Sequence, residues 1–281
     1  MKNSTPHPLD LKLPRLAASH YLNSAPLIWS FIHGHAKNTL QLIDAVPAAC
    51  GEMLSRREVE GALVPVIEYQ RIPGILLVPD VCVGSRGNVR SVVLVTRKDD
   101  LRDVRSVALD ESSRTSVMLL KIIFREFLGI DPEWNEFKPD LNLMLSENDA
   151  ALIIGDPAMT FTQDGLRIFD MASLWREYTG KGFVFAMWAV RQDRVHLINH
   201  IDFVEARDEG LKHIDEIVTH YEKHIPLSRE QLKTYLTDNI TYNVDKSMEN
   251  GLGLFFDLAF KHGLVEELKP HRFVNASAMI D

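Results

Sequence analysis

A run of hydroxyl side chains with one arginine stands where a buried strand is expected to give way to a helix. The predicted strand covers residues 106–109 and the predicted helix residues 115–127. One hydroxyl would be enough to cap that helix. Helix amides, hydroxyl donors and the helix dipole together favour an anion, and the absence of P-loop glycine spacing favours a carboxylate over a nucleotide phosphate. The candidate ligands are Ser112, Ser113, Arg114, Thr115 and Ser116, with Ser113 as an ordinary N-cap being the alternative.

Two further strand ends carry polar residues of the same kind. Asn23 and Ser24 follow a strand predicted at 15–19, where they either cap the next helix or present an amide and a hydroxyl to a cleft. Gly155 and Asp156 follow a strand predicted at 150–154. Gly155 permits close backbone approach, and Asp156 either caps the next helix or orients a ligand. Ser91 is expected near the point where two lobes meet.

The elements that must position these residues alternate between strand and helix, which is typical of an α/β protein with largely parallel sheets. Further strands are predicted at 40–45, 61–66, 89–96 and 183–190, and the chain from 196 onward is predicted to be mostly helical. Ligands of open α/β sheets bind beyond the carboxyl ends of the strands. We expect two lobes, with residues 1–96 in the first, 97–190 in the second, and 191–281 completing the first. A single doubly wound domain is the alternative.

The composition of the chain indicates which class of molecule it binds. The formal net charge of -8 argues against nucleic acid and against anionic membrane surfaces, so a small molecule is the expected ligand. Cys50 and Cys82 show no metal or redox spacing and are expected in the core. His33 and His35 lack a third ligand and are expected at the surface, which argues against a metal site. The sequence contains no GxGxxG dinucleotide fingerprint, so no cofactor is expected. The absence of an export signal and of a membrane-length apolar run predicts a cytoplasmic protein.

The assembled motifs resemble those of the menaquinone-biosynthesis family MqnA. The resemblance spans roughly residues 14 to 190 and extends more loosely into the helical tail. The motifs that carry it are residues 21–27 (YLNSAPL), 62–69 (ALVPVIEY), 84–87 (GSRG), 107–110 (VALD), 113–117 (SRTSV), 153–156 (IIGD) and, more generally, 180–188.

This resemblance implies the type II periplasmic-binding-protein fold, with a ligand cleft between the lobes, and a cofactor-independent hydro-lyase. The implied reaction converts chorismate to 3-[(1-carboxyvinyl)oxy]benzoate in the futalosine pathway. Asn23 and Ser91 would then act near the departing hydroxyl, while the hydroxyl residues at 112–116 would hold a carboxylate of this dicarboxylate substrate. Asp156 is the one protein carboxylate that the motifs offer as a base, and a substrate carboxylate is the alternative.

Two other functions remain open at this point. One is that of the sister enzyme of the same pathway and fold, which releases 1,4-dihydroxy-6-naphthoate from a cyclised futalosine. The other is a non-catalytic module that binds an aromatic acid. The hydroxyl-rich turn and the Asn23 motif favour the dehydratase over the sister enzyme. The sequence makes no prediction of the oligomeric state.

Overall fold

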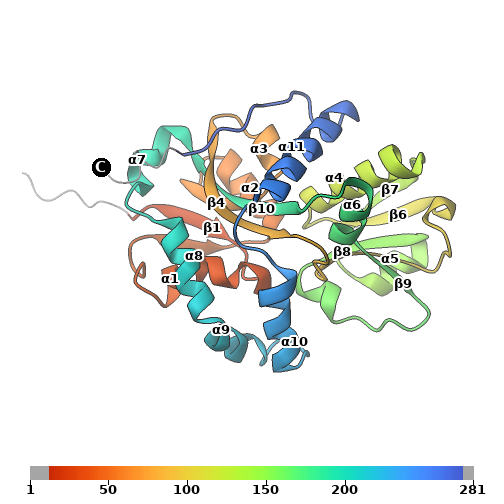
Figure 1. Cartoon of the computed structure of the whole chain (residues 1–281), viewed down its shortest axis with the longest axis horizontal. Helices are drawn as coiled ribbons and strands as arrows, with labels where there is room; N and C mark the ends of the chain where they lie inside the picture. The colour runs from red at the N-terminus through yellow and green to blue at the C-terminus, as the bar shows by residue number, and fades with distance from the viewer. Residues whose placement is uncertain (1–12, 275–281) are drawn as a thin grey trace, which may run out of the picture.

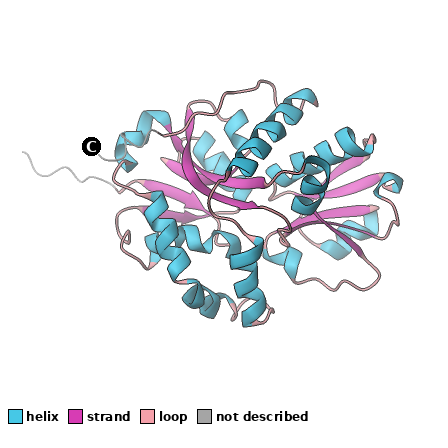
Figure 2. Cartoon of the chain, in the orientation of Figure 1, coloured by secondary structure: helices cyan, strands magenta, loops and turns pink. Residues whose placement is uncertain are grey.

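The computed structural model describes residues 13–274 and contains two five-stranded sheets, each flanked by helices (Figures 1 and 2). The first sheet has the order β2-β1-β3-β10-β4. Its strands are β1 (Arg15–Ala18), β2 (Gln41–Asp44), β3 (Gly61–Pro65), β4 (Ile75–Ser85) and β10 (Phe183–Arg191). Strands β2, β1 and β3 are parallel, whereas β10 runs antiparallel to both of its neighbours.

The second sheet has the order β7-β6-β8-β5-β9. Its strands are β5 (Val92–Thr96), β6 (Ser106–Asp110), β7 (Glu133–Phe137), β8 (Ala150–Ile154) and β9 (Arg167–Asp170). Strands β7, β6 and β8 are parallel, and β5 is antiparallel to β8 and β9. Two separate sheets confirm the two-lobed α/β prediction and exclude the single doubly wound sheet.

The lobe limits predicted from the sequence are wrong for two strands. β5 was assigned to the first lobe but pairs in the second sheet, and β10 was assigned to the second lobe but pairs in the first. The chain therefore leaves the first sheet after Ser85, at residues 86–91, and returns after α6, at residues 180–182. The apolar pattern identified both strands correctly, but it does not encode which sheet provides their hydrogen-bonding partners.

Helices cover both sheets. Those of the first lobe before the crossover are α1 (Ala25–Ile32), which follows the 3-10 turn η1 (Leu22–Ser24), α2 (Pro47–Ser55) and α3 (Glu68–Arg71). The second lobe contains α4 (Thr115–Ile122), extended by a π-helical turn (Ile123–Leu128), α5 (Leu141–Glu147), the 3-10 turn η4 (Asp156–Met159) and α6 (Met171–Thr179). Strands β3, β5 and β8 are buried at every position, as expected for strands covered on both faces.

The chain after β10 is mostly helical, as predicted. It forms α7 (Val195–Ile198), α8 (Phe203–Lys212), α9 (Ile214–Tyr221), α10 (Arg229–Thr234), the π-helical turn η6 (Tyr235–Asn239) and α11 (Lys246–Lys261). Figure 1 shows α8 and α9 along the first lobe and α10 close to the junction of the lobes. Both cysteines are buried, as predicted. Within residues 13–274, no helix is long and apolar enough to cross a membrane.

Candidate functional site

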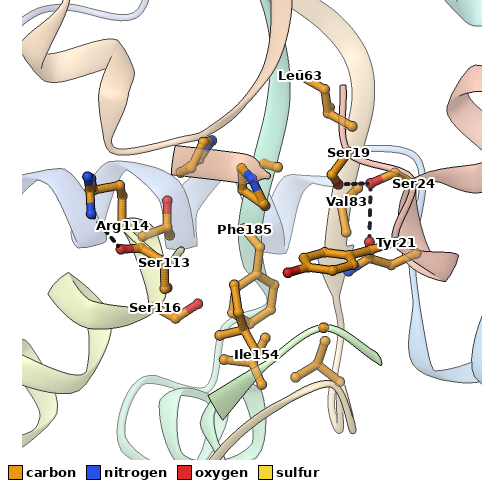
Figure 3. Close-up of a pocket in the computed structure, with 18 residues that line it drawn as sticks. Ser19, Tyr21, Ser24, Leu63, Val83, Ser113, Arg114, Ser116, Ile154 and Phe185 are labelled. Carbon is orange, nitrogen blue, oxygen red and sulfur yellow. Dashed lines mark hydrogen bonds between the residues drawn. The ribbon is translucent and has the colours of Figure 1, made fainter. Parts of the chain in front are cut away.

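A cavity lies between the two lobes, and its wall comes from both (Figure 3). The space between the wall atoms is about 590 Å³, part of it open to solvent. The lining residues are Ser19, Tyr21, Asn23, Ser24, Pro47, Leu63, Pro65, Val83, Val89, Val92, Ser113, Arg114, Thr115, Ser116, Ile154, Gly155, Phe185 and Ala186. Seven of the ten site residues predicted from the sequence line this cavity, whereas Ser91, Ser112 and Asp156 do not.

The start of α4 supplies the hydroxyl-rich wall. Its N-cap position is Arg114, which makes no side-chain capping hydrogen bond, so the N-cap role considered for Ser113 is not what the structure has. The first amides of a helix have no acceptor within the helix. At α4 these amides stand beside the Ser113 and Ser116 side chains, which face the cavity (Figure 3). The arrangement offers an anion several donors at one place.

The other two hydroxyls of the turn have partners in the protein. The Thr115 hydroxyl oxygen accepts from the backbone amide of Ile67 in the first lobe, at 3.2 Å. The Ser112 hydroxyl donates to the Asp110 carboxylate at 2.6 Å, and the Ser112 amide donates to the same oxygen. Ser112 therefore lies behind the cavity wall, holding the end of β6 in place. Thr115 lines the cavity, but its hydroxyl oxygen already accepts the hydrogen bond from the other lobe.

Arg114 is the one side chain among the lining residues that carries a charge, and its guanidinium is held by the protein. It donates to the backbone oxygens of Glu111 and Ser113, and it pairs with Glu52 of the first lobe at 3.4 Å. An acidic neighbour thus holds this candidate ligand from the side of the first lobe. Arg114 therefore contributes both positive potential at the cavity wall and a bridge between lobes.

Ser24 occupies the N-cap position of α1, as expected for one of the pair Asn23 and Ser24, but no side chain caps the helix there. Neither side chain makes a capping hydrogen bond at this helix. Instead, the Ser24 hydroxyl donates to the Asn23 side-chain oxygen at 3.2 Å and lies 3.1 Å from the Ser19 hydroxyl (Figure 3). These three residues form a polar patch opposite Ser113 and Ser116. The amide nitrogen of Asn23 can donate to a ligand while its oxygen is engaged.

Gly155 allows the lobes to approach each other closely. Its φ of +69° is a conformation that favours glycine, and an added Cβ would lie 3.0 Å from the ring of Tyr21 in the opposite lobe. The next residue, Asp156, accepts a hydrogen bond at 3.2 Å from the backbone amide of Leu22. The Asp156 side chain neither caps η4 nor lines the cavity. Burial raises its pKa to about 6, opposed by the bond from Leu22.

Backbone amides of the first lobe meet acceptors of the second at three points. Besides the Leu22 and Ile67 bonds, the Ala48 amide donates to the Ser112 carbonyl at 3.2 Å. These bonds and the Arg114–Glu52 pair hold the two lobes together beside the cavity. The structure is therefore that of a closed form.

Ser91 lies in the crossover between the lobes and is fully buried. Its hydroxyl oxygen accepts from the Tyr235 hydroxyl at 2.7 Å, and its carbonyl accepts from the Gly155 amide at 2.8 Å. The predicted position at the meeting of the lobes is correct. Ser91 nevertheless stands behind the lining residues Val89, Val92 and Gly155.

The apolar part of the site was not predicted from the sequence. The ring of Phe185, from β10, lies in the middle of the cavity wall, flanked by Leu63, Val83 and Ile154 (Figure 3). Tyr21 was part of a quoted motif but was given no role. Its position directly after the first strand was the available signal, whereas Phe185 lies in an apolar run that gives no hint of exposure to a cavity. A flat apolar ligand with polar groups at its ends fits such a wall.

Among residues 13–274, no three His, Cys, Asp or Glu side chains come together as metal ligands do. His33 and His35 are exposed, as expected for surface residues. The cavity itself is lined by no Asp, Glu, His or Lys side chain. Its chemistry therefore consists of hydroxyl, amide and backbone donors, one arginine and an apolar floor.

Solved structures share this fold. An Archaeoglobus fulgidus protein superposes with a TM-score of 0.72 at 20% identity, covering 92% of this chain and 100% of its own. A ligand-binding component of an ABC-type import system from Staphylococcus aureus gives 0.64 at 16% identity, covering 95% and 98%. The periplasmic aliphatic sulphonate binding protein of Escherichia coli gives 0.59 at 15% identity, covering 93% and 94%. The predicted periplasmic-binding-protein fold is confirmed.

Sequence comparison identifies the family. The family model described as menaquinone biosynthesis matches residues 14–261. A chorismate dehydratase of Thermus thermophilus is 32% identical over 267 residues, which cover 88% of this chain and 94% of the relative. The resemblance seen in the motifs is confirmed over nearly the whole described chain. This protein belongs to the menaquinone-biosynthesis family.

Proposed function

We propose that this protein is a chorismate dehydratase, an enzyme that removes water from chorismate to give 3-[(1-carboxyvinyl)oxy]benzoate in the futalosine pathway. The 32%-identical Thermus relative of that name supports the activity. The observation that carries the proposal in the structure is the cavity between the lobes, with an apolar floor and uncapped helix amides at one wall. Chorismate is a cyclohexadiene ring with two carboxylates, and both features suit it.

The ring carboxylate would bind at the start of α4. Ser113 and Ser116 face the cavity, and the first amides of α4 add donors that strengthen as negative charge develops. Removing the ring proton spreads charge through the diene toward this carboxylate. Donors fixed at that point therefore stabilise the transition state more than the ground state.

Asn23 and Ser24, on the opposite wall, would receive the departing hydroxyl. The Asn23 amide can donate a hydrogen bond to that oxygen while its own oxygen is held by Ser24. The ring proton and the hydroxyl leave together as water, and the ring becomes aromatic. Gly155 contributes backbone at the same place, where its close fit against Tyr21 excludes solvent.

The ring proton goes first to the substrate's own enolpyruvyl carboxylate, which passes it to the departing hydroxyl so that water leaves. No Asp, Glu, His or Lys lines the cavity, and Asp156 is engaged with the Leu22 amide behind the wall. The lone arginine is paired with Glu52. A carboxylate enclosed without a cation of its own is a stronger base than one in water, because burial raises its pKa. Asp156 would then serve lobe closure, in place of the base role that the motifs alone suggest.

A panel of two substrates tests the proposal. Purified protein is incubated separately with chorismate and with a cyclised futalosine, and products are followed by chromatography. The expected result is a single aromatic product from chorismate and no change in the futalosine. Turnover of the futalosine derivative alone would identify the sister enzyme, and saturable binding of chorismate without product would identify a binding module.

A further inference from the structure

Tyr235 comes from the helical tail, far along the chain from every motif of the site. It is the first residue of η6, directly after α10, and its side chain is fully buried. Its hydroxyl donates to the Ser91 hydroxyl at 2.7 Å, across 144 residues of sequence. The tail, which completes the first lobe, thus makes a direct polar contact with the crossover between lobes.

Ser91 in turn is hydrogen-bonded to two residues of the cavity wall. Its amide donates to the Val89 carbonyl at 2.8 Å, and its carbonyl accepts from the Gly155 amide at 2.8 Å. Val89 and Gly155 both line the cavity. A shift of Ser91 would therefore move two parts of the wall at once.

Asn23, in the cavity wall of the first lobe, lies close to the same hydroxyl. Burial raises the pKa of Tyr235, whereas the neighbouring side chains of Ser91 and Asn23 act to lower it. The Tyr235 hydroxyl is therefore bonded to the crossover between the lobes at a point next to the wall of the first lobe.

We propose, on the basis of the dehydratase function above, that Tyr235 is a positioning residue for the reaction: its hydroxyl holds Ser91, and through Ser91 the wall residues Val89 and Gly155, in place. It does not line the cavity and does not contact the substrate. Its effect is on geometry: a small displacement of a group that meets the departing hydroxyl lowers the rate without weakening the bulk of substrate binding.

A neighbouring tyrosine provides a matched control. Tyr242 is 4% exposed, and its hydroxyl is the one buried side-chain nitrogen or oxygen without a hydrogen-bond partner in residues 13–274. The two buried tyrosines therefore differ in whether the hydroxyl is used. Removal of an unpaired hydroxyl is expected to be neutral or stabilising, whereas removal of a paired one leaves its partners unsatisfied.

The experiment compares Tyr235→Phe with Tyr242→Phe in the full chain, measuring kcat and KM for chorismate and the free energy of unfolding. Tyr235→Phe is expected to lower kcat about 10- to 100-fold with KM changed less than about threefold. Tyr242→Phe is expected to retain the wild-type kcat. A wild-type kcat in Tyr235→Phe, or the same loss in both variants, would overturn the positioning role.

A double variant tests the route through Ser91. If Tyr235 acts through this serine, combining Tyr235→Phe with Ser91→Ala lowers kcat by less than the product of the two single effects. A fully multiplicative loss would refute that route. Wild-type protein assayed in parallel separates the two claims: inactivity toward chorismate would refute both the function and the role, whereas an active wild type with a normal Tyr235→Phe would refute the role alone.

Discussion

At the scale of single residues, the four hydroxyls of the 112–116 turn have different tasks. Ser112 is bonded to Asp110, and Thr115 accepts from Ile67 across the lobes. Ser113 and Ser116 face the cavity at the start of α4 and are available to a ligand. An excess of hydroxyls at one helix start therefore serves packing, lobe closure and ligand binding together.

The first prediction concerns Ser116. Ser116→Ala removes one donor to the substrate carboxylate without breaking a hydrogen bond described within the protein. A hydrogen bond to a charged group contributes about 1.5–3 kcal/mol, so KM for chorismate or kcat/KM should worsen by about tenfold or more. Ser146→Ala, at an exposed position on α5, is the control. Unchanged kinetics in Ser116→Ala would place the carboxylate elsewhere.

A second prediction follows from the burial of Asp156, whose pKa is raised from 3.8 to about 6. The folded protein holds this proton more tightly than the unfolded chain, so the stability it contributes is present below about pH 4 and is lost as pH rises through about 6. Asp156→Asn removes this titration and retains an acceptor for Leu22. The variant should therefore gain stability relative to the wild type between pH 4 and 7, by about 1–2 kcal/mol after screening.

Denaturant unfolding of both proteins across this range measures the effect. The difference in unfolding free energy should grow with pH and level off above about pH 7. A difference that stays constant with pH would mean that Asp156 is not desolvated in solution.

The residue types at the strand ends predicted part of the site, but which of these side chains face the cavity depends on how the folded chain buries them. The strand-end rule located Asn23, Gly155 and the 113–116 turn correctly at one cavity. It does not distinguish a side chain that faces a ligand from one that faces the next layer, as with Ser91 and Ser112. Tyr235 was beyond reach because its partners lie in other elements, and only the folded chain brings them together.

At the scale of elements, the turn from β8 into η4 sets how closely the lobes approach. Gly155 adopts a φ of +69° and packs on the Tyr21 ring. Gly165 has nearly the same φ, +68°, but an added Cβ there would meet nothing within 4 Å. Substitution of either glycine would therefore strain the backbone to a similar extent. Only at Gly155 would the new side chain also meet the other lobe.

Replacing each glycine by alanine separates these effects. Both variants should lose on the order of 1 kcal/mol of stability from backbone strain. Gly155→Ala should in addition raise KM for chorismate or lower kcat by at least about tenfold, because the Tyr21 ring must move away and the cavity opens. Steady-state kinetics with thermal unfolding checks both. Equal activity in the two variants would show that the Tyr21 contact is dispensable.

Strand β5 illustrates what local pattern leaves open. All five of its residues are buried, four of them are apolar, and its existence was predicted correctly. It was assigned to the wrong lobe because the crossover precedes it, in the short turn at residues 86–91, and not in the polar stretch at 97–100. The prediction of two lobes was nevertheless correct, because the alternation of strands and helices was predicted correctly before and after the crossover.

At the scale of the whole molecule, three backbone bonds and one ion pair join the lobes over the cavity. Hydrogen bonds and ion pairs of this kind can break and re-form as ligand enters and leaves. We predict that the ligand-free protein opens in solution and that saturating aromatic product lowers its radius of gyration toward the value calculated from the closed structure. Small-angle scattering measures this change. Identical profiles with and without product would mean that the cavity is permanently closed.

The central claim is that a closed cavity without a protein base lets chorismate remove its own proton. Turnover of chorismate by Asp156→Asn, with the product identified by chromatography, tests it most directly. Asp156 is the one protein carboxylate that the motifs offer as a base, and the variant keeps the acceptor for Leu22. The account predicts the same aromatic product with kcat within about tenfold of the wild type. A folded variant whose kcat falls by about 10²-fold or more, the usual contribution of a general base, would contradict it.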